Sequence, residues 1–286
     1  MMAIVLSLVA AAIYGAGDFV GGLAARRVSV LFVVGVGQVV GLVGLAALSP
    51  LLPAEQVRST DLWWGAASGV STAVGITLLY KALASGRMSV VAPITALCAL
   101  AVPIAFAAVV GLTVSLLAAS GIAVAALAVA LISREPDRAD ASPTGALGAM
   151  ALAAAAGLGI GVFYVTMGRT DPASGLWPLV AARAVSTALF ALAALATLPR
   201  WRRAAAPVGV LWRWAALSGL CDSAANALYL LASHEGNLAI IATLTSLYPA
   251  STVFLAAATL GERLRLTQIV GLGLAIVAVV MIVMGR

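Results

Sequence analysis

TQIVGLGLAIVAVVMIVM, residues 267–284, decides the class of fold, because it is an unbroken run without a charged side chain. An α-helix rises about 1.5 Å per residue, so about 20 apolar residues cross the hydrocarbon core of a bilayer. Nine further runs of similar length occur, and none alternates as a strand would. We therefore predict an all-α polytopic membrane protein with ten transmembrane helices, at residues 3–23, 29–48, 62–80, 88–109, 112–132, 145–165, 175–197, 210–231, 238–259 and 267–284.

The composition supports lipid as the main solvent. Of 286 residues, 63% are hydrophobic and 9% are charged, with a mean hydropathy of +1.14. A soluble domain carries about 25% charged residues, so this chain cannot build a water-facing surface all round. The net charge of +6 comes from basic residues in short groups between apolar runs, as topology signals are. We expect a lipid bilayer as partner and no nucleic acid.

The residues that usually hold metals or cofactors are few. Cys98 and Cys221 both lie inside apolar runs, and His234 is the only histidine. No metal-ligand spacing and no nucleotide-binding segment occurs, so we expect no metal site, no cofactor and no ATP-driven pump. Small buried hydrophobic side chains are the simplest interpretation of the two cysteines.

A polar segment, residues 133–143, divides the chain into a first unit at 1–132 and a second at 144–286, each with five apolar runs. A shift of 150 residues aligns three helices of the two units without gaps. The matched pairs are Trp64 and Trp214, Ser68 and Ser218, Gly69 and Gly219, Gly86 and Gly236, Thr95 and Thr245, Gly111 and Gly261, and Gly121 and Gly271.

The odd number of helices in each unit has a topological consequence. Two consecutive five-helix units must enter the membrane in opposite directions, which predicts two inverted repeats. Many secondary transporters are built this way, with a binding site at mid-bilayer between the halves and alternating access by rocking.

The basic residues predict an orientation. Twelve of the 16 Lys and Arg residues lie in the links after the odd-numbered helices, against three, Arg58, Arg169 and Arg286, on the other side. The positive-inside rule then places both termini outside the cell.

Three segments near the C-terminus carry a resemblance. They are LTSLYP at 244–249, TLGERL at 259–264 and QIVGLG at 268–273, and together they resemble the end of an EamA domain. That family belongs to the drug/metabolite transporter superfamily, and the resemblance covers the whole chain as two five-helix repeats. It implies a small-solute permease, often an exporter, that uses no ATP. It also implies cytoplasmic termini, which is opposite to the charge rule.

The first half departs from the family pattern. Leu112 stands opposite Glu262, so the Gly-Glu turn of the second half has no counterpart in the first. Gln38 stands where helix 2 of this family often carries an arginine, and Arg183 in helix 7 is the candidate for the matching position of the second repeat.

Asp222 is the clearest candidate for function, because it lies near the middle of helix 8. A charge at a helix centre costs about 2.5–3.5 kcal/mol on insertion scales, so it should face the interior and have a partner. Asn226 lies one turn later on the same face. Asp222 is either a protonatable coupling site or cation-binding group, or a structural partner of Arg183 or of a hydroxyl.

Further polar residues extend the candidate site. Arg183 either binds a substrate carboxylate, neutralises Asp222 or snorkels to the surface. Asp18 either joins a substrate or coupling site or pairs with Arg26 or Arg27 at the interface. Gln38 bonds either a substrate or a neighbouring helix.

Aromatic and proline residues complete the list of candidates. Tyr14 and Tyr248 lie deep enough to line a cavity, although tyrosines are common as interfacial anchors. Pro93, Pro103 and Pro249 interrupt backbone hydrogen bonding and predict helix kinks, which flank binding sites in many transporters, or simply pack.

The function predicted from these features is secondary transport of small organic metabolites or drugs across the plasma membrane, with proton coupling through a buried aspartate. The protein would be a monomer or homodimer and no enzyme. Two alternatives stay open. The GxGD of Gly15–Asp18 with Asp222 resembles the dyad of intramembrane aspartyl proteases, and a membrane scaffold or lipid scramblase is the other. Asp222 with aromatics suits cations as substrates, whereas Arg183 suits carboxylates.

Overall fold

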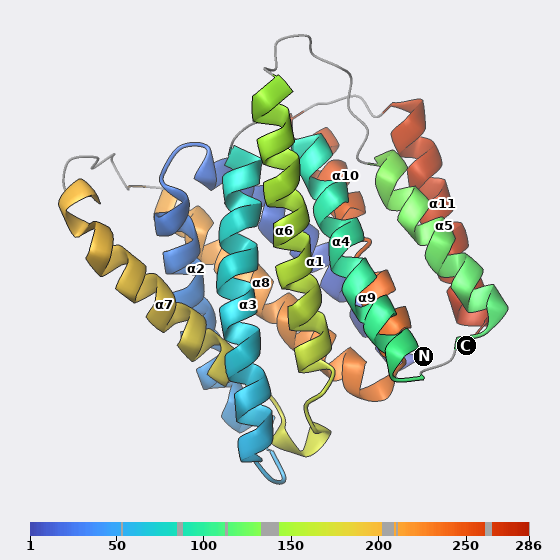
Figure 1. Cartoon of the computed structure of the whole chain (residues 1–286), viewed down its shortest axis with the longest axis horizontal. Helices are drawn as coiled ribbons and strands as arrows, with labels where there is room; N and C mark the ends of the chain where they lie inside the picture. The colour runs from blue at the N-terminus through green and yellow to red at the C-terminus, as the bar shows by residue number, and fades with distance from the viewer. Residues whose placement is uncertain are drawn as a thin grey trace.

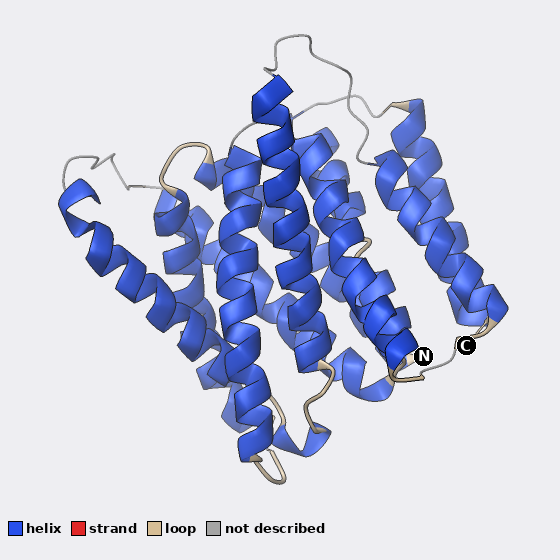
Figure 2. Cartoon of the chain, viewed as in Figure 1, coloured by secondary structure: helices blue, strands red, loops and turns tan. Residues whose placement is uncertain are grey.

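The computed structural model describes residues 1–52, 54–84, 88–111, 114–132, 143–201, 209, 211–260 and 265–285. Within these ranges every regular element is a helix and no strand occurs, as Figure 2 shows. The all-α class is therefore confirmed for the described part of the chain. The polar segment at 133–142 and the turn at 261–264, which carries Glu262, lie outside the described residues.

The helices pack side by side as one bundle, with the two termini at the same end (Figure 1). Short 3-10 turns, η1 (Ser49–Leu51) and η2 (Pro172–Ser174), interrupt two of the links. In chain order the helices are α1 (Met2–Ala25), α2 (Val30–Leu48), α3 (Ser59–Ala84), α4 (Met88–Val109), α5 (Leu116–Ile132), α6 (Pro143–Met167), α7 (Trp177–Trp201), α8 (Leu211–Glu235), α9 (Leu238–Thr245), α10 (Pro249–Leu260) and α11 (Leu266–Met284).

Several helices begin where the sequence offers a capping residue. The side chain of Ser29 accepts a hydrogen bond from the backbone N–H of Phe32 at the start of α2, at 3.2 Å. The side chain of Asn237 does the same for Ala239 at the start of α9, at 3.0 Å. These caps satisfy donors that the first turn of a helix leaves free.

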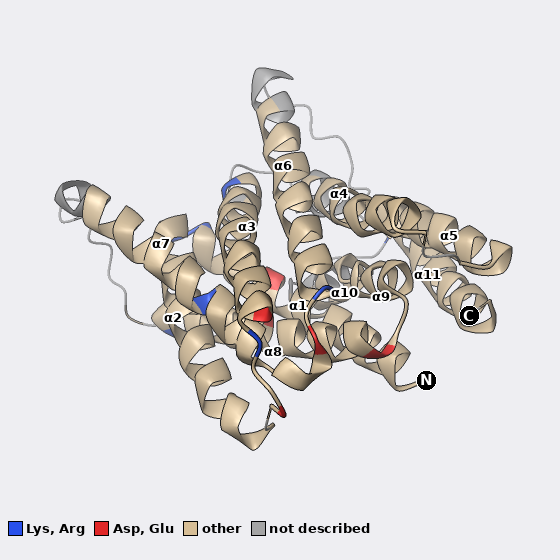
Figure 3. Cartoon of the chain, turned by 60° about the horizontal axis from the view of Figure 1, so that its bottom comes forward, with Lys and Arg blue, Asp and Glu red and all other residues tan. Residues whose placement is uncertain are grey.

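Seven of the described helices are long and apolar enough to cross a membrane. They are Met2–Ala25, Val30–Leu51, Ser59–Leu83, Gly148–Met167, Trp177–Ala196, Leu211–Glu235 and Leu266–Met284. Three shorter apolar helices accompany them, Ile94–Val109, Leu116–Ile132 and Leu238–Thr252. Large apolar side chains face outward, among them Val109 at 86% and Leu116 at 87% exposed, and the helices carry few charges (Figure 3). Such a surface suits contact with lipid.

The prediction of one continuous helix over 238–259 is wrong, because the helix breaks between α9 and α10. The N–H groups of Leu247 and Tyr248 bond three residues back, to Leu244 at 3.3 Å and Thr245 at 3.2 Å, which tightens the turn. Pro249 then has no N–H to offer and becomes the first residue of α10. The Pro249 interruption therefore ends one helix and starts another, whereas α4 runs on through Pro93 and Pro103.

The helices of the second half make contacts that correspond to those of the helices of the first half. α1 packs on α8 as α6 packs on α3, and α2 packs on α8 as α7 packs on α3. α6 contacts α4 as α1 contacts α9 and α10, while α5 pairs with α11 and α2 with α7. The close approaches repeat as well: a Cβ on Gly219 would lie 2.3 Å from Cα of Gly37, and a Cβ on Gly69 would lie 2.4 Å from the oxygen of Ala182.

Polar residues tie two links together at the end of the bundle that holds the termini. The N–H of Gln56 bonds the oxygen of Ala173 at 3.1 Å, and Arg58 forms an ion pair with Asp171. Ser174 donates to buried Asp61 at 2.6 Å. We call Gln56, Arg58, Asp61, Asp171 and Ser174 the loop cluster. It joins the link after α2 to the link after α6.

Candidate functional site

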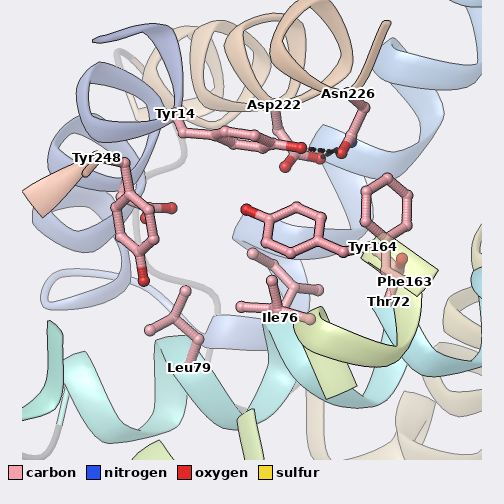
Figure 4. A pocket seen from close by; sticks show the side chains of 11 residues that line it. Tyr14, Thr72, Ile76, Leu79, Phe163, Tyr164, Asp222, Asn226 and Tyr248 are labelled. Atoms are coloured by element: carbon pink, nitrogen blue, oxygen red, sulfur yellow. Dashed lines mark hydrogen bonds between the residues drawn. The ribbon is translucent and has the colours of Figure 1, made fainter. Parts of the chain in front are cut away.

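A cavity of about 40 Å³ lies between α1, α3, α6, α8 and the turn that joins α9 to α10 (Figure 4). This volume has room for a few water molecules and not for a drug-sized ligand. The residues that line it are Tyr14, Asp18, Thr72, Ile76, Leu79, Ile160, Phe163, Tyr164, Asp222, Asn226 and Tyr248.

One wall of the cavity is polar and comes from α1 and α8. The hydroxyl of Tyr14 donates a hydrogen bond to Oδ1 of Asn226, and Nδ2 of Asn226 donates to Oδ2 of Asp222 at 3.2 Å (Figure 4). The expected placement of Asp222 and Asn226 on one helix face is therefore confirmed. The chain of bonds fixes the Tyr14 ring across the gap between the two helices.

Arg183 lies behind this wall and holds Asp222 in place. Its Nη2 donates to Oδ2 of Asp222, and its Nη1 donates to Oε1 of Gln38 at 2.7 Å. Gln38 also accepts a bond from Ser186 at 2.7 Å. The side chain of Arg183 is 4% exposed and does not line the cavity. Of the arrangements open from sequence, the structure has the pairing of Arg183 with Asp222, and Gln38 bonds a neighbouring helix.

Gly41 explains how an arginine fits between packed helices. A Cβ at this position would lie 3.4 Å from Nε of Arg183 and 2.2 Å from the hydroxyl of Ser223. The guanidinium group therefore passes over a position where α2 carries no side chain. A buried ion pair of this kind is stable only while both partners and their hydrogen bonds remain in place.

Asp18 lines the same cavity but differs from Asp222 in its partners. Within the described residues its carboxylate makes no hydrogen bond and no ion pair, and the expected alternative of pairing with Arg26 or Arg27 is not found there. Asp18 enters from α1, between Gly17 and Phe19, where the backbone of α1 lies close to α8. The cavity therefore holds one compensated carboxylate and one without a compensating charge.

The opposite wall is apolar and aromatic and comes from α3 and α6. Ile76, Leu79 and Ile160 face the cavity with Thr72, and the ring of Tyr164 lies across it (Figure 4). Tyr164 stacks on Tyr229, with ring centroids 4.4 Å apart. Tyr248 stands at the side, and its hydroxyl is buried without a hydrogen-bond partner in the described structure.

The residues that sequence reasoning missed are those of the apolar wall. The repeat contains the signal that finds two of them, because a shift of 150 places Thr72 opposite Asp222 and Ile76 opposite Asn226. Both members of each pair line the cavity. Ile160 and Phe163 lie in α6, outside the gapless alignment, and no pattern in the sequence marks them.

The seven predicted site residues come together in one connected group. Five line the cavity, and the other two, Arg183 and Gln38, form the layer behind it; the five are Tyr14, Asp18, Asp222, Asn226 and Tyr248. Their roles remain predictions. Among the described residues no group of three or more His, Cys, Asp and Glu side chains is placed to hold a metal ion.

The long apolar helices and the apolar outer surface of the bundle define an integral membrane protein, and comparison with known proteins assigns its family. The model of the EamA-like transporter family matches residues 1–134 and 144–284, so the chain belongs to that family, and with it to the drug/metabolite transporter superfamily. The resemblance found in the sequence is confirmed.

Solved structures support the fold. One titled "Crystal structure of protein" has a TM-score of 0.73 over 99% of this chain and 97% of that chain, at 15% identity. At this identity the likeness concerns the fold alone. No curated protein matches the sequence.

Proposed function

We propose that the protein is a secondary active transporter that exports small organic molecules across the plasma membrane by alternating access. The observation that carries the proposal is the cavity between the two family-matched halves, where carboxylates face apolar side chains. Charged groups inside a membrane bundle are retained at substrate and ion pathways.

We further propose that ten spans form two inverted five-helix repeats. The bond between Gln56 and Ala173 supports this, because it joins the link after the second helix of one half to the link after the first helix of the other. Those links lie on the same membrane face only if the halves run in opposite directions. Gln38 and Arg183, which lie in the second helix of each half, also bond each other directly, as residues beside a twofold axis do.

Alternating access needs a closed end and a site that can widen. The loop cluster closes the end that holds the termini, since it links the two halves by an ion pair and several hydrogen bonds. The cavity is too small for most metabolites in this state. Substrate binding therefore requires the wall of α1 and α8 to part from the wall of α3 and α6, which fits rocking of one half against the other.

Coupling to protons is proposed through a carboxylate of the cavity. Asp18 and Asp222 are the two carboxylates that line the cavity, and a carboxylate can take up and release a proton. Two carboxylates lining one cavity are also the observation that favours an intramembrane aspartyl protease. Family membership favours transport, and Asp222 is held by Arg183 and Asn226 rather than by a second carboxylate.

Purified protein in sealed vesicles tests the proposal. A transporter moves a labelled solute from a metabolite and amine panel down an imposed pH gradient, and collapse of the gradient with an ionophore stops net accumulation. A protease cleaves a transmembrane peptide without any gradient, and a scramblase moves labelled lipid without one. Either of these results in place of solute flux contradicts the proposal.

A further inference from the structure

We infer that the cavity selects a lipophilic monocation, an amine with an aromatic or aliphatic body, and binds its charged head at Asp18 in exchange for one proton. The inference deepens the proposed transport function by naming the substrate class, and its biological meaning rests on that function.

The charges of the described residues around the cavity do not balance. The described cavity region holds two carboxylates against one arginine, and Arg183 is already bonded to Asp222 and Gln38. Among the residues that the structure describes, Asp18 is therefore the cavity carboxylate without a compensating cation. A buried carboxylate without a partner is costly, so a positive charge from outside, a proton or a ligand cation, is stabilised beside it.

The remaining described neighbours of Asp18 supply no competing cation. The titratable groups near it are Tyr80 from α3, Tyr164 from α6, Asp222 from α8 and Tyr248 from the turn before α10, with Tyr14 on α1 itself. The tyrosine hydroxyls are neutral, and Tyr80 is occupied by a bond of 2.8 Å to Ser218. Exchange at this site therefore involves one positive charge.

The aromatic rings favour an organic cation over a metal ion. Tyr14, Tyr164 and Phe163 line the cavity, and aromatic faces attract ammonium groups by cation–π interaction. Ile76, Leu79 and Ile160 offer apolar surface for a hydrocarbon body on the opposite wall. The pocket is thus polar on one side and apolar on the other, which matches an amphipathic amine.

The same arrangement disfavours anions. A substrate carboxylate needs a free donor cation, yet Arg183 is buried behind Asp222 and does not line the cavity. A carboxylate in the cavity would instead face Asp18 and Asp222, and like charges at close range repel. Of the two substrate classes that the sequence leaves open, the geometry points to cations.

Binding to purified protein tests the inference with three probes of similar shape: 2-phenylethylammonium, 2-phenylethanol and 3-phenylpropanoate. We expect the ammonium probe to bind at least about tenfold more tightly than the other two, a factor equivalent to about 1.4 kcal/mol. Calorimetry in two buffers of different ionisation enthalpy should show release of about one proton per bound cation, since one charge replaces one charge at the site.

Asp18→Asn should abolish both the preference for the cation and the proton release, because the amide has the carboxylate's shape without its charge. Asp18→Glu should retain both. The matched control is Glu55→Gln, which removes an exposed carboxylate in the link after α2 and should bind as the wild type does. Elution volume and thermal unfolding check that Asp18→Asn folds, and proton release by the wild type gives a readout independent of any variant.

The inference is overturned if the ammonium probe fails to bind at millimolar concentration, if the anion binds equally well, or if Asp18→Asn keeps the cation's affinity. Vesicle flux separates this failure from failure of the transport proposal. Flux of the anionic or neutral probe without cation binding contradicts the proposed substrate class and supports the transport proposal. Cation binding with proton release but without flux supports the cation site and contradicts the transport proposal.

Discussion

Two aspartates line the cavity, and they differ in what compensates their charge. Asp222 accepts bonds from Arg183 and Asn226, whereas Asp18 has no such partner within the described residues. From the sequence Asp222 is the clearest candidate for proton coupling, since it is the more central of the two in its helix. That role stays a prediction, and the ion pair gives Asp222 a second task, which is to keep Arg183 neutralised.

A double-mutant cycle separates the two tasks of Asp222. Asp222→Asn leaves a buried guanidinium without its carboxylate, and breaking a buried pair in this way costs about 3–5 kcal/mol. We expect a lower Tm and loss of transport in this variant. Arg183→Gln added to it removes the stranded charge and should restore both the Tm and the flux. A double variant that is stable yet inactive would support Asp222, rather than Asp18, as the coupling group.

At the scale of the elements, glycines decide how closely the halves approach. A Cβ on Gly219 would lie 2.3 Å from Cα and 2.4 Å from the oxygen of Gly37, and backbone atoms cannot move aside as a side chain can. Small residues allow this approach between membrane helices, where packing rather than water drives association. The contact between α2 and α8 therefore depends on the absence of a side chain at Gly219, whereas a Cβ on Gly37 would lie 3.3 Å from Cα of Gly219 and would need only a small shift.

Gly219→Ala should destabilise the bundle, because the added methyl group overlaps α2, and overpacking costs about 1–3 kcal/mol. Gly35→Ala is the matched control, since a Cβ there meets nothing within 4 Å. Alanine favours a helix over glycine by about 1 kcal/mol, so the control should be neutral or stabilising. Thermal unfolding in detergent measures both. Equal effects of the two substitutions would contradict the close packing of α2 on α8.

Much of the helical architecture can be predicted from the sequence, and the errors of that prediction have local causes. The start of α2 matches the expectation within one residue, and α4 matches it at both ends. The predicted helix over 238–259 fails because hydropathy registers neither the tightened turn at Leu247 and Tyr248 nor the missing N–H of Pro249. Apolar content is unchanged across the break. Pro249 predicts a kink there, but only the backbone geometry shows that one helix ends and another begins.

At the scale of the whole molecule, the inverted arrangement makes a prediction about sidedness. The link after α1 and the link after α6 should lie on opposite membrane faces, because they follow the first helix of each half. Parallel copies would place them on the same face. The charge rule puts the link after α1 in the cytoplasm, whereas the family resemblance implies the reverse.

Cysteine labelling tests this prediction. Cys98 and Cys221 are replaced by alanine, and single cysteines are introduced by Ser29→Cys or Pro172→Cys, both at exposed link positions. In intact cells a membrane-impermeant maleimide should label one of the two and not the other, and lysis should make both reactive. Labelling of both in intact cells would refute the inversion. The position that reacts also decides between the charge rule and the resemblance for the location of the termini.

Composition and hydropathy alone determined that the chain is a helical membrane protein, and short motifs alone placed it in its family, because these properties depend on runs of neighbouring residues. Only the tertiary structure decided which carboxylate is compensated. Arg183 and Asp222 are 39 residues apart, and Arg183 and Gln38 are 145 apart, so their pairing depends on how α2, α7 and α8 pack. That Asp18 has no compensating partner among the described residues, and with it the expected substrate, follows from that packing.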